Sequence, residues 1–178
     1  AKMVATWFDQ IRHACLDPDE ISYNIALNSC AQGGLVEDAE RWLRRMREAS
    51  VKANPISYTA VIDSCAKRGD AHKAALWLEE MLRLGLKVDV IAFNAVINAS
   101  TKCGKVSDTI RWMHRMRDAC VAPDEISYNS VINALARQGS LREAADWFHS
   151  MVGRCLRPAV ASYNTMINGF SQAGRPLE

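Results

Sequence analysis

The sequence repeats itself at an interval of 35 residues. The stretch EISYNIALN, which begins at Glu20, returns as EISYNSVIN at Glu125, three intervals later, and related stretches begin at Pro55, Val90 and Val160. All five tryptophans of the chain lie on the same interval: Trp7, Trp42, Trp77, Trp112 and Trp147. A fixed interval of about 20 to 50 residues is typical of proteins built from stacked repeats. The sequence therefore predicts a repeat array with a continuous core rather than one globular domain.

Each repeat contains two segments with the spacing of an amphipathic helix. With Glu20 as position 1, the first segment has apolar residues at i, i+3, i+4 and i+7, namely Tyr23, Ala26, Leu27 and Cys30. The second segment has the same spacing, at Ala39, Trp42, Leu43 and Met46, and Gly34 lies between the two. A helical hairpin of this kind cannot bury its apolar stripe alone and must stack on its neighbours. The predicted fold is an all-α solenoid, with the repeated tryptophans, tyrosines and methionines in its core.

The interval also predicts how the chain is divided. Four complete repeats are expected, at 20–54, 55–89, 90–124 and 125–159. Residues 1–19 would be a partial repeat that contributes a second helix, and residues 160–178 a partial repeat that contributes a first helix. Because the chain opens inside one repeat and stops inside another, we expect it to be a piece of a longer protein.

Three positions of the first helix are polar in every repeat and lie on one face, at i, i+4 and i+8. Position 5 holds Asn24, Thr59, Asn94, Asn129 and Asn164. Position 9 holds Asn28, Asp63, Asn98, Asn133 and Asn168. Position 13 holds Gln32, Lys67, Lys102, Arg137 and Gln172. Asparagine is a mediocre helix former, so its repeated use indicates a role for the side chain. Stacked rows of amides with a basic edge suit a polar polymer with a negatively charged backbone.

Composition limits the other functions that the chain could have. The formal net charge of +2 neither requires nor excludes a nucleic-acid partner. No apolar run is long enough to predict a membrane span. The six cysteines contain no CxxC pair, so they are expected to be buried or half-buried thiols rather than disulfides or metal ligands. We find no nucleophile–base pair, metal-ligand spacing or phosphate loop, and thus expect no catalytic, metal or cofactor site in these residues.

The repeat resembles the pentatricopeptide repeat over practically the whole chain. The resemblance rests on the 35-residue unit, on Tyr-Asn at positions 4 and 5, on A-x-x-W-L-x-x-M in the second helix and on Pro-Asp at the end. The tetratricopeptide repeat, a related hairpin of 34 residues that generally binds peptides, begins with W-x-x-L-G-x-x-Y, which is absent here. The resemblance implies a right-handed superhelical solenoid that binds single-stranded RNA, with one base per repeat.

The resemblance also implies that positions 5 and 35 read the bases. These residues are Asn24 with Asn54, Thr59 with Asp89, Asn94 with Asp124, and Asn129 with Ala159, together with Asn164 and Asp19 in the partial repeats. By the family's pairing habit, the four complete repeats read 5′-(C/U)-G-U-(pyrimidine)-3′. Ala159 departs from the pattern because it makes no side-chain hydrogen bond, so a loose preference is expected there. Position 35 also precedes a helix, where Asp and Asn are favoured caps, so both roles stay open.

Two further sets complete the expected site. In the family, aliphatic side chains at position 2 sandwich each base between neighbouring repeats. Here they are Ile21, Ile56, Ile91 and Ile126, whereas Ala161 departs from the pattern. The basic side chains of position 13, Lys67, Lys102 and Arg137, are expected to contact phosphates, the alternative being that they are solvated turn residues.

The predicted function is therefore sequence-specific binding of single-stranded RNA, in RNA processing, stability or translation in a mitochondrion or chloroplast. A second hypothesis is a helical-repeat scaffold that contacts other proteins of a large organellar assembly. The near-neutral charge and the departures at Ala159 and Ala161 keep this hypothesis open. A third hypothesis is an enzyme, because many relatives carry a catalytic domain after the array. Any catalysis would then lie outside this segment.

Overall fold

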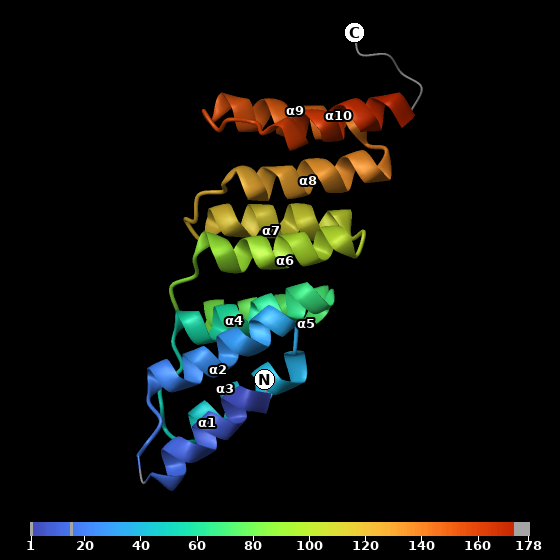
Figure 1. Cartoon of the computed structure of the whole chain (residues 1–178). Coiled ribbons are helices and arrows are strands. Elements are labelled where there is room, and N and C mark those ends of the chain that lie inside the picture. The colour runs from blue at the N-terminus through green and yellow to red at the C-terminus, as the bar shows by residue number, and fades with distance from the viewer. Residues whose placement is uncertain (1, 15, 173–178) are drawn as a thin grey trace. The chain divides into compact units, whose positions relative to one another are not determined.

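The computed structural model describes residues 2–14 and 16–172, so that Cys15 and the last six residues of the predicted partial repeat lie outside the described ranges. Within these ranges the chain is helical, with no strand (Figure 1). Its ten helices are α1 (Lys2–His13), α2 (Glu20–Gly33), α3 (Val36–Glu48), α4 (Pro55–Arg68), α5 (Ala71–Arg83), α6 (Val90–Lys102), α7 (Val106–Asp118), α8 (Glu125–Gln138), α9 (Leu141–Gly153) and α10 (Val160–Gln172). The prediction of two helices in each complete repeat is confirmed.

The helix starts follow from short polar signals at position 35. The side chains of Asp19, Asn54, Asp89 and Asp124 each accept a hydrogen bond of 2.9 Å from the backbone N–H three residues later. These bonds satisfy one of the N–H groups that the first turn of a helix leaves without a partner. Position 35 thus caps the first helix of the following repeat, and Ala159, which has no such oxygen, is the exception.

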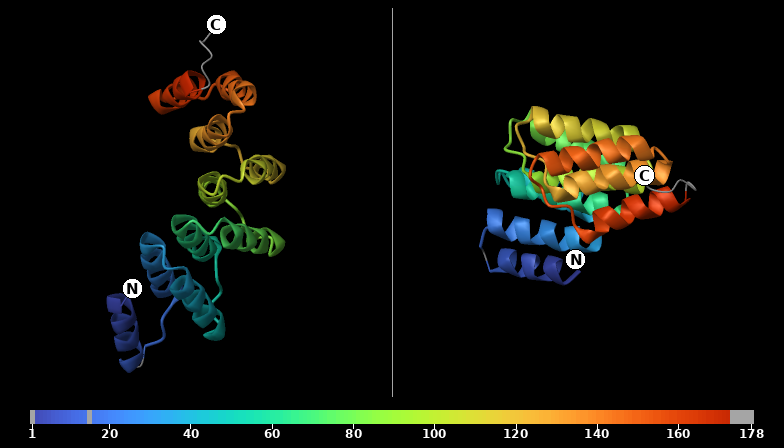
Figure 2. Two further views of the ribbon diagram at one scale, coloured as in Figure 1. Left: turned by 90° about the vertical axis from the view of Figure 1, so that its right-hand side faces the viewer. Right: turned by 90° about the horizontal axis from the view of Figure 1, so that it is seen from above.

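Contacts between Cα atoms divide the chain into two compact units, Ala1–Ala99 and Ser100–Glu178. In the first unit α2 packs against α3 and α4, and α4 packs against α3 and α5. In the second unit α8 packs against α7, α9 and α10, and α10 also packs against α9. Figure 2 shows the helices of each unit lying side by side as hairpins. The first helices α2, α4 and α8 therefore each contact both their own hairpin partner and an adjacent repeat.

The buried residues are largely those of the repeated apolar stripe. In the first unit Leu27, Leu43 and Met46 are among the largest fully buried side chains, and in the second unit Trp112 and Tyr128 are. Core placement was wrong for Trp7 and Tyr163, which are 64% and 50% exposed. They belong to the partial repeats, in which the other helix of the hairpin is missing from this chain. Trp77 and Trp147 are half-buried.

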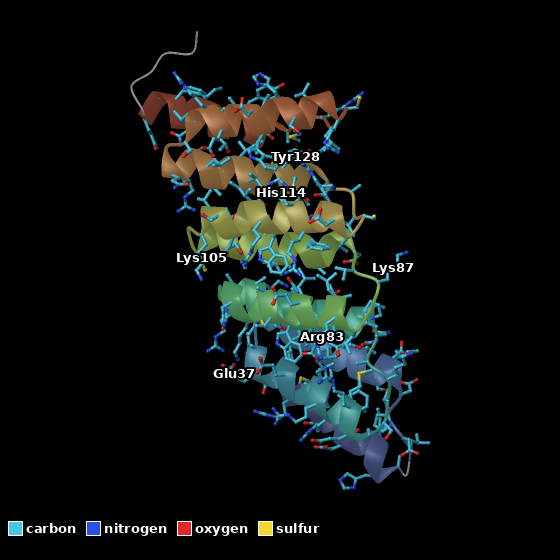
Figure 3. All side chains as sticks on the ribbon, turned by 180° about the vertical axis from the view of Figure 1, so that it is seen from behind. Glu37, Arg83, Lys87, Lys105, His114 and Tyr128 are labelled. Atoms are coloured by element: carbon cyan, nitrogen blue, oxygen red, sulfur yellow. The ribbon has the colours of Figure 1, made fainter. Side chains whose placement is uncertain are left out.

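Ion pairs join the second helices of the first unit to neighbouring repeats. Arg68 lies 2.6 Å from Glu37, Lys73 lies 3.1 Å from Glu40, and Arg47 lies 2.7 Å from Glu80. Glu37 is labelled in Figure 3, which shows the side chains from behind. Surface pairs of this kind contribute at most about 1 kcal/mol each. Burial of the apolar stripe therefore contributes most of the free energy that holds neighbouring repeats together.

The cysteines divide into two groups. Cys30 and Cys65 are buried, as expected, and burial raises the pKa of the Cys65 thiol to about 12. The expectation of burial was wrong for Cys103, Cys120 and Cys155, which are exposed. The last two lie in the loops after α7 and α9, where the apolar stripe has already ended. None of the described helices has the length and the apolar character that crossing a membrane requires.

Candidate nucleic-acid interface

The isoleucines at position 2 are exposed and do not belong to the buried core. Ile21, Ile56, Ile91 and Ile126 are between 57% and 67% exposed. They lie at the same place in the first turns of α2, α4, α6 and α8. Single exposed apolar residues are ordinary, but one at the same position of four repeats suggests a contact surface. Ala161, at this position in α10, is also exposed but offers a much smaller apolar face.

A hollow of about 300 Å³ in the first unit brings one complete set of the predicted residues together. It is lined by Ile56 and Ile91, the two side chains expected to sandwich a base, and by Thr59 and Asp89, the two expected to read it. Asp63, from position 9 of the same helix, also lines it. The volume is at the low end of the range for small-ligand pockets, so the hollow suits one planar ring system.

The position-5 side chains lie at the edge of the buried layer. Asn24, Thr59, Asn94 and Asn129 are half-buried, whereas Asn164 is exposed. Asn24 Oδ1 accepts a hydrogen bond of 2.7 Å from Ser57 Oγ, and Asn129 Oδ1 accepts one of 2.6 Å from Ser162 Oγ. In both cases the serine belongs to the following repeat. The two asparagines are therefore held in one orientation before any ligand arrives.

At position 35 the capping role is observed, and it leaves room for a second role. The helix N–H bonds only Oδ1 of the Asp or Asn side chain. The second polar atom of the side chain is left for another partner. In Asn54 that atom, Nδ2, donates to Glu20 Oε1. The backbone N–H of Ser22 is the main cause that lowers the pKa of Asp19, so this carboxylate stays ionised at neutral pH.

The basic side chains of position 13 are exposed but do not share one environment. Lys102 and Arg137 line a hollow of about 350 Å³ in the second unit. Lys67 instead makes a 2.8 Å ion pair with Asp63, one turn earlier on α4. The other repeats have asparagine at position 9, where α4 has Asp63, so the pairing is particular to α4.

Two features of the site were not anticipated from the sequence. One is the contact between the serine at position 3 and the asparagine of the preceding repeat, and the other is the Asp63–Lys67 pair. A signal for the first exists, because position 3 reads Ser22, Ser57, Ala92, Ser127 and Ser162. The signal for the second is the only acidic residue in the position-9 row, four residues before a lysine.

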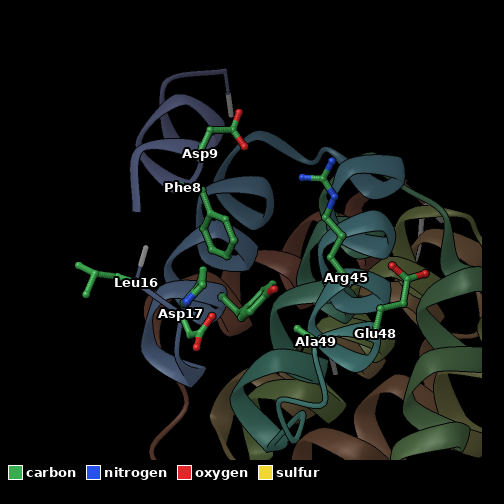
Figure 4. Close-up of a pocket in the computed structure, with 9 residues that line it drawn as sticks. Phe8, Asp9, Leu16, Asp17, Arg45, Glu48 and Ala49 are labelled. Atoms are coloured by element: carbon green, nitrogen blue, oxygen red, sulfur yellow. The ribbon is translucent and has the colours of Figure 1, made fainter. Parts of the chain in front are cut away.

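Another hollow lies elsewhere, beside α1. It has a volume of about 580 Å³ and is lined by residues of α1, the loop after α1, α2, α3 and the residue that follows α3 (Figure 4). Phe8, Asp17 and Arg45 are among them, and none of its lining residues belongs to positions 2, 5 or 13. Among the described residues no group of three or more His, Cys, Asp or Glu side chains could hold a metal ion.

Comparison with known sequences identifies the class to which this chain belongs. Residues 18–67, 88–137 and 123–172 match the PPR repeat family, and residues 56–86 match the PPR repeat. The chain therefore belongs to the pentatricopeptide repeat family, as the resemblance predicted. Among curated proteins there is no match.

Solved structures of the same class share its fold. The pentatricopeptide repeat protein PPR10 from maize is 23% identical, with a TM-score of 0.85 over 96% of this chain. The chain covers 24% of the PPR10 chain, about a quarter of its length. The PPR domain of Arabidopsis thaliana protein-only RNase P 1, solved in complex with tRNA, is 11% identical, with a TM-score of 0.82 over 95% of this chain and 89% of that one. These similarities confirm the predicted fold class, an all-α solenoid of stacked helical hairpins.

Proposed function

We propose that this chain binds single-stranded RNA through the face formed by positions 2, 5, 13 and 35, with one base per repeat. The observation that carries the proposal is the hollow in which Ile56 and Ile91 flank Thr59 and Asp89. Two apolar side chains can stack on the faces of a base, while a hydroxyl and a carboxylate beside them bond its edge. PPR10 has been solved in complex with an 18-nt psaJ RNA element, which supports RNA as the ligand of such an array.

The base preferences follow from the side chains of each repeat. Asn24 with Asn54 favours a pyrimidine, cytosine rather than uracil, and Thr59 with Asp89 favours guanine. Asn94 with Asp124 favours uracil, whereas Asn129 stands alone because Ala159 offers no polar atom. The preferred site is then 5′-(C/U)-G-U-(pyrimidine)-3′, with Lys102 and Arg137 placed to contact phosphates. As the family resemblance implies, we place this activity in RNA processing, stability or translation in a mitochondrion or chloroplast.

The affinity of four repeats should be modest. Stacking contributes about 1–3 kcal/mol per base, from which the cost of ordering a flexible strand must be subtracted. We expect a Kd near micromolar or weaker at physiological salt, and an affinity that falls as salt is raised because phosphate contacts release counterions. The assignment concerns binding alone and places no catalytic step in these residues.

The test is a fluorescence anisotropy titration of the chain against short RNAs that contain the preferred site, with permuted sites as competitors. The preferred site should compete better than its permutations. Equal competition by all sequences would remove the base-reading role. If no single-stranded RNA binds even at several hundred micromolar protein, the proposal fails and the scaffold hypothesis takes its place.

A further inference from the structure

The hydroxyl at position 3 joins consecutive repeats at the base-reading side chains. Ser57, on α4, is fully buried, and Ser162, on α10, is 2% exposed. Each donates its proton to the Oδ1 atom of the position-5 asparagine in the preceding repeat, Asn24 or Asn129. These are short bonds from buried serines to half-buried asparagines, so they hold the asparagine more firmly than a fully exposed bond could.

Ser57 also reaches the other base-reading residue of the same repeat. Its Oγ lies 3.0 Å from Asn54 Oδ1, and it accepts the backbone N–H of Asn54 at 3.2 Å. One buried hydroxyl therefore contacts both Asn24 at position 5 and Asn54 at position 35. The relative placement of the two side chains is fixed by a third residue, which itself has no access to the ligand.

The contact decides which atoms of the asparagine face the ligand. When Oδ1 is occupied by the serine, the amide turns Nδ2 and its two protons outward. Donors of this kind match the acceptors on a pyrimidine edge, namely O2 and N3 of cytosine or O2 and O4 of uracil. Without the serine the amide can rotate by half a turn and present oxygen instead, which would favour the opposite hydrogen-bond pattern.

We propose that Ser57 and Ser162 are positioning residues for base recognition, each of which orients the position-5 asparagine of the repeat before it. The proposal rests on the function proposed above. By the same register Ser127 follows Asn94. The base preference of one repeat is thus set by three residues, one of which belongs to the next repeat.

The chain contains its own contrast to this arrangement. The repeat that holds threonine rather than asparagine at position 5, with Thr59, is followed by Ala92 rather than serine at position 3. Ala92 is fully buried, as Ser57 is, so the site has the same burial and lacks only the hydroxyl. The serine is therefore present where an amide needs to be oriented and absent where a hydroxyl takes its place.

The first experiment removes one hydroxyl and compares base preference with stability. Ser57→Ala should reduce the ratio of pyrimidine to purine affinity at the first base by about two- to tenfold, the effect of one net hydrogen bond. Preference at the second base should not change. The matched control is Ser22→Ala, because Ser22 Oγ bonds the cap Asp19 at 2.8 Å but no position-5 residue precedes it in this chain. Both variants lose a side-chain hydrogen bond at the helix cap, so both should have a slightly lower melting temperature.

The second experiment builds the contact where it is absent. Thr59→Asn alone gives an asparagine whose amide has no serine to bond at position 3 of the next repeat. Thr59→Asn with Ala92→Ser gives an asparagine whose Oδ1 can accept a hydrogen bond from the new serine, as Asn24 accepts one from Ser57. The double variant should discriminate pyrimidine from purine at the second base about two- to tenfold better than the single one. Ala92→Ser alone serves as the control for adding a buried hydroxyl, and it should leave the guanine preference in place.

The outcomes separate this proposal from the function on which it rests. If the unaltered chain binds no RNA, the proposed function fails and the positioning role fails with it. If the unaltered chain discriminates at the first base and Ser57→Ala keeps the same ratio, only the positioning role is overturned. An equal loss of affinity for all RNAs in Ser57→Ala and Ser22→Ala also overturns it, because the serine would then serve the helix cap alone.

Discussion

At the scale of single residues, the loops after the second helices contain an unusual backbone conformation. Ser50, Cys120 and Cys155 all have positive φ, at 56°, 58° and 60°, and Gly85 occupies the same position of the remaining repeat with a φ of 66°. This left-handed region costs an ordinary L residue about 1–2 kcal/mol, whereas glycine adopts it freely. Three of the four repeats therefore retain local strain that the fourth avoids.

Replacing Cys155 with glycine should stabilise the chain. The relief of backbone strain exceeds the extra entropy that glycine loses on folding, so we expect a gain of about 0.5–1 kcal/mol. Thermal melting should show a midpoint a few degrees higher, and Gly85→Cys should lower it. The control is Cys103→Gly, since Cys103 is also exposed but is not among the residues with positive φ. Stabilisation by Cys103→Gly as well would point to removal of the thiol as the cause.

Thr59→Asn is expected to change which RNA is preferred without affecting the fold. The substitution makes the repeat at 55–89 match that at 90–124, Asn with Asp, so its preference should move from guanine to uracil. A mismatched base leaves buried polar groups without partners, which corresponds to about a five- to hundredfold switch. Competition between RNAs that differ only at the second base measures it. The reciprocal control, Asn94→Thr, should move the third base from uracil towards guanine; retention of guanine by Thr59→Asn argues that position 5 does not read bases.

The period predicted residues that line the hollow, but not the hydrogen bonds between consecutive repeats. Ile56, Thr59 and Asp89 could be named because each occupies a fixed place in the repeat. The bond from Ser57 to Asn24 could not, since it joins residues 33 apart and depends on how α4 rests on α2. Apolar periodicity shows which face of a helix is buried, and it contains no information about distances across an interface.

At the scale of the helix, α4 differs from the other first helices in the charge of the residue at position 9. Asp63 replaces the asparagine found at position 9 elsewhere, and it holds Lys67 in an ion pair of 2.8 Å. Asp63 also lines the hollow that contains Thr59 and Asp89. In the proposed function this carboxylate competes with phosphate for the lysine and adds negative charge where a polyanion would lie.

Asp63→Asn should therefore tighten RNA binding. Release of Lys67 from an exposed pair of about 0.5–1 kcal/mol corresponds to a two- to fivefold lower Kd, and the salt dependence should become steeper. Titrations at two salt concentrations would measure both effects. Asp38→Asn is the matched control, because it changes the net charge equally and breaks the exposed Asp38–Arg41 pair on α3. The same gain from Asp38→Asn would mean that total charge, not Lys67, sets the affinity.

At the scale of the whole molecule, the fold could be predicted almost entirely from one number, the repeat interval. Helix positions followed from apolar spacing within each interval, and stacking followed because a lone hairpin leaves its stripe exposed. The errors in the predicted aromatic core occurred at Trp7 and Tyr163, where a hairpin is incomplete. A periodic rule treats every repeat alike, so it fails where a neighbouring helix that the rule assumes is missing.

The basic residues at position 13 come from several repeats, so their effect on binding is expected to be a property of these repeats together. Changing Lys67, Lys102 and Arg137 to alanine should weaken binding to every RNA sequence alike, and should lower the slope of log affinity against log salt by about 1.4, at about 0.7 for each of the two phosphate contacts of Lys102 and Arg137. Lys67 adds little to this change because Asp63 holds it in an ion pair. Melting should hardly change because all three side chains are exposed. A triple variant at Arg44, Arg83 and Arg142, exposed on second helices, removes the same charge. Unaltered RNA affinity in the first triple variant would show that its side chains are only solvated.

The bond between Ser57 and Asn24 crosses the boundary at which the sequence is divided into repeats. For protein engineering, a block exchanged as residues 20–54 would carry both asparagines into a new array and leave behind the serine that holds them. A block cut at residues 23–57 would keep all three together, at the same length. Modules that transfer a base preference intact should therefore be joined after position 3, a few residues inside the helix, rather than at the loop where the repeats visibly meet.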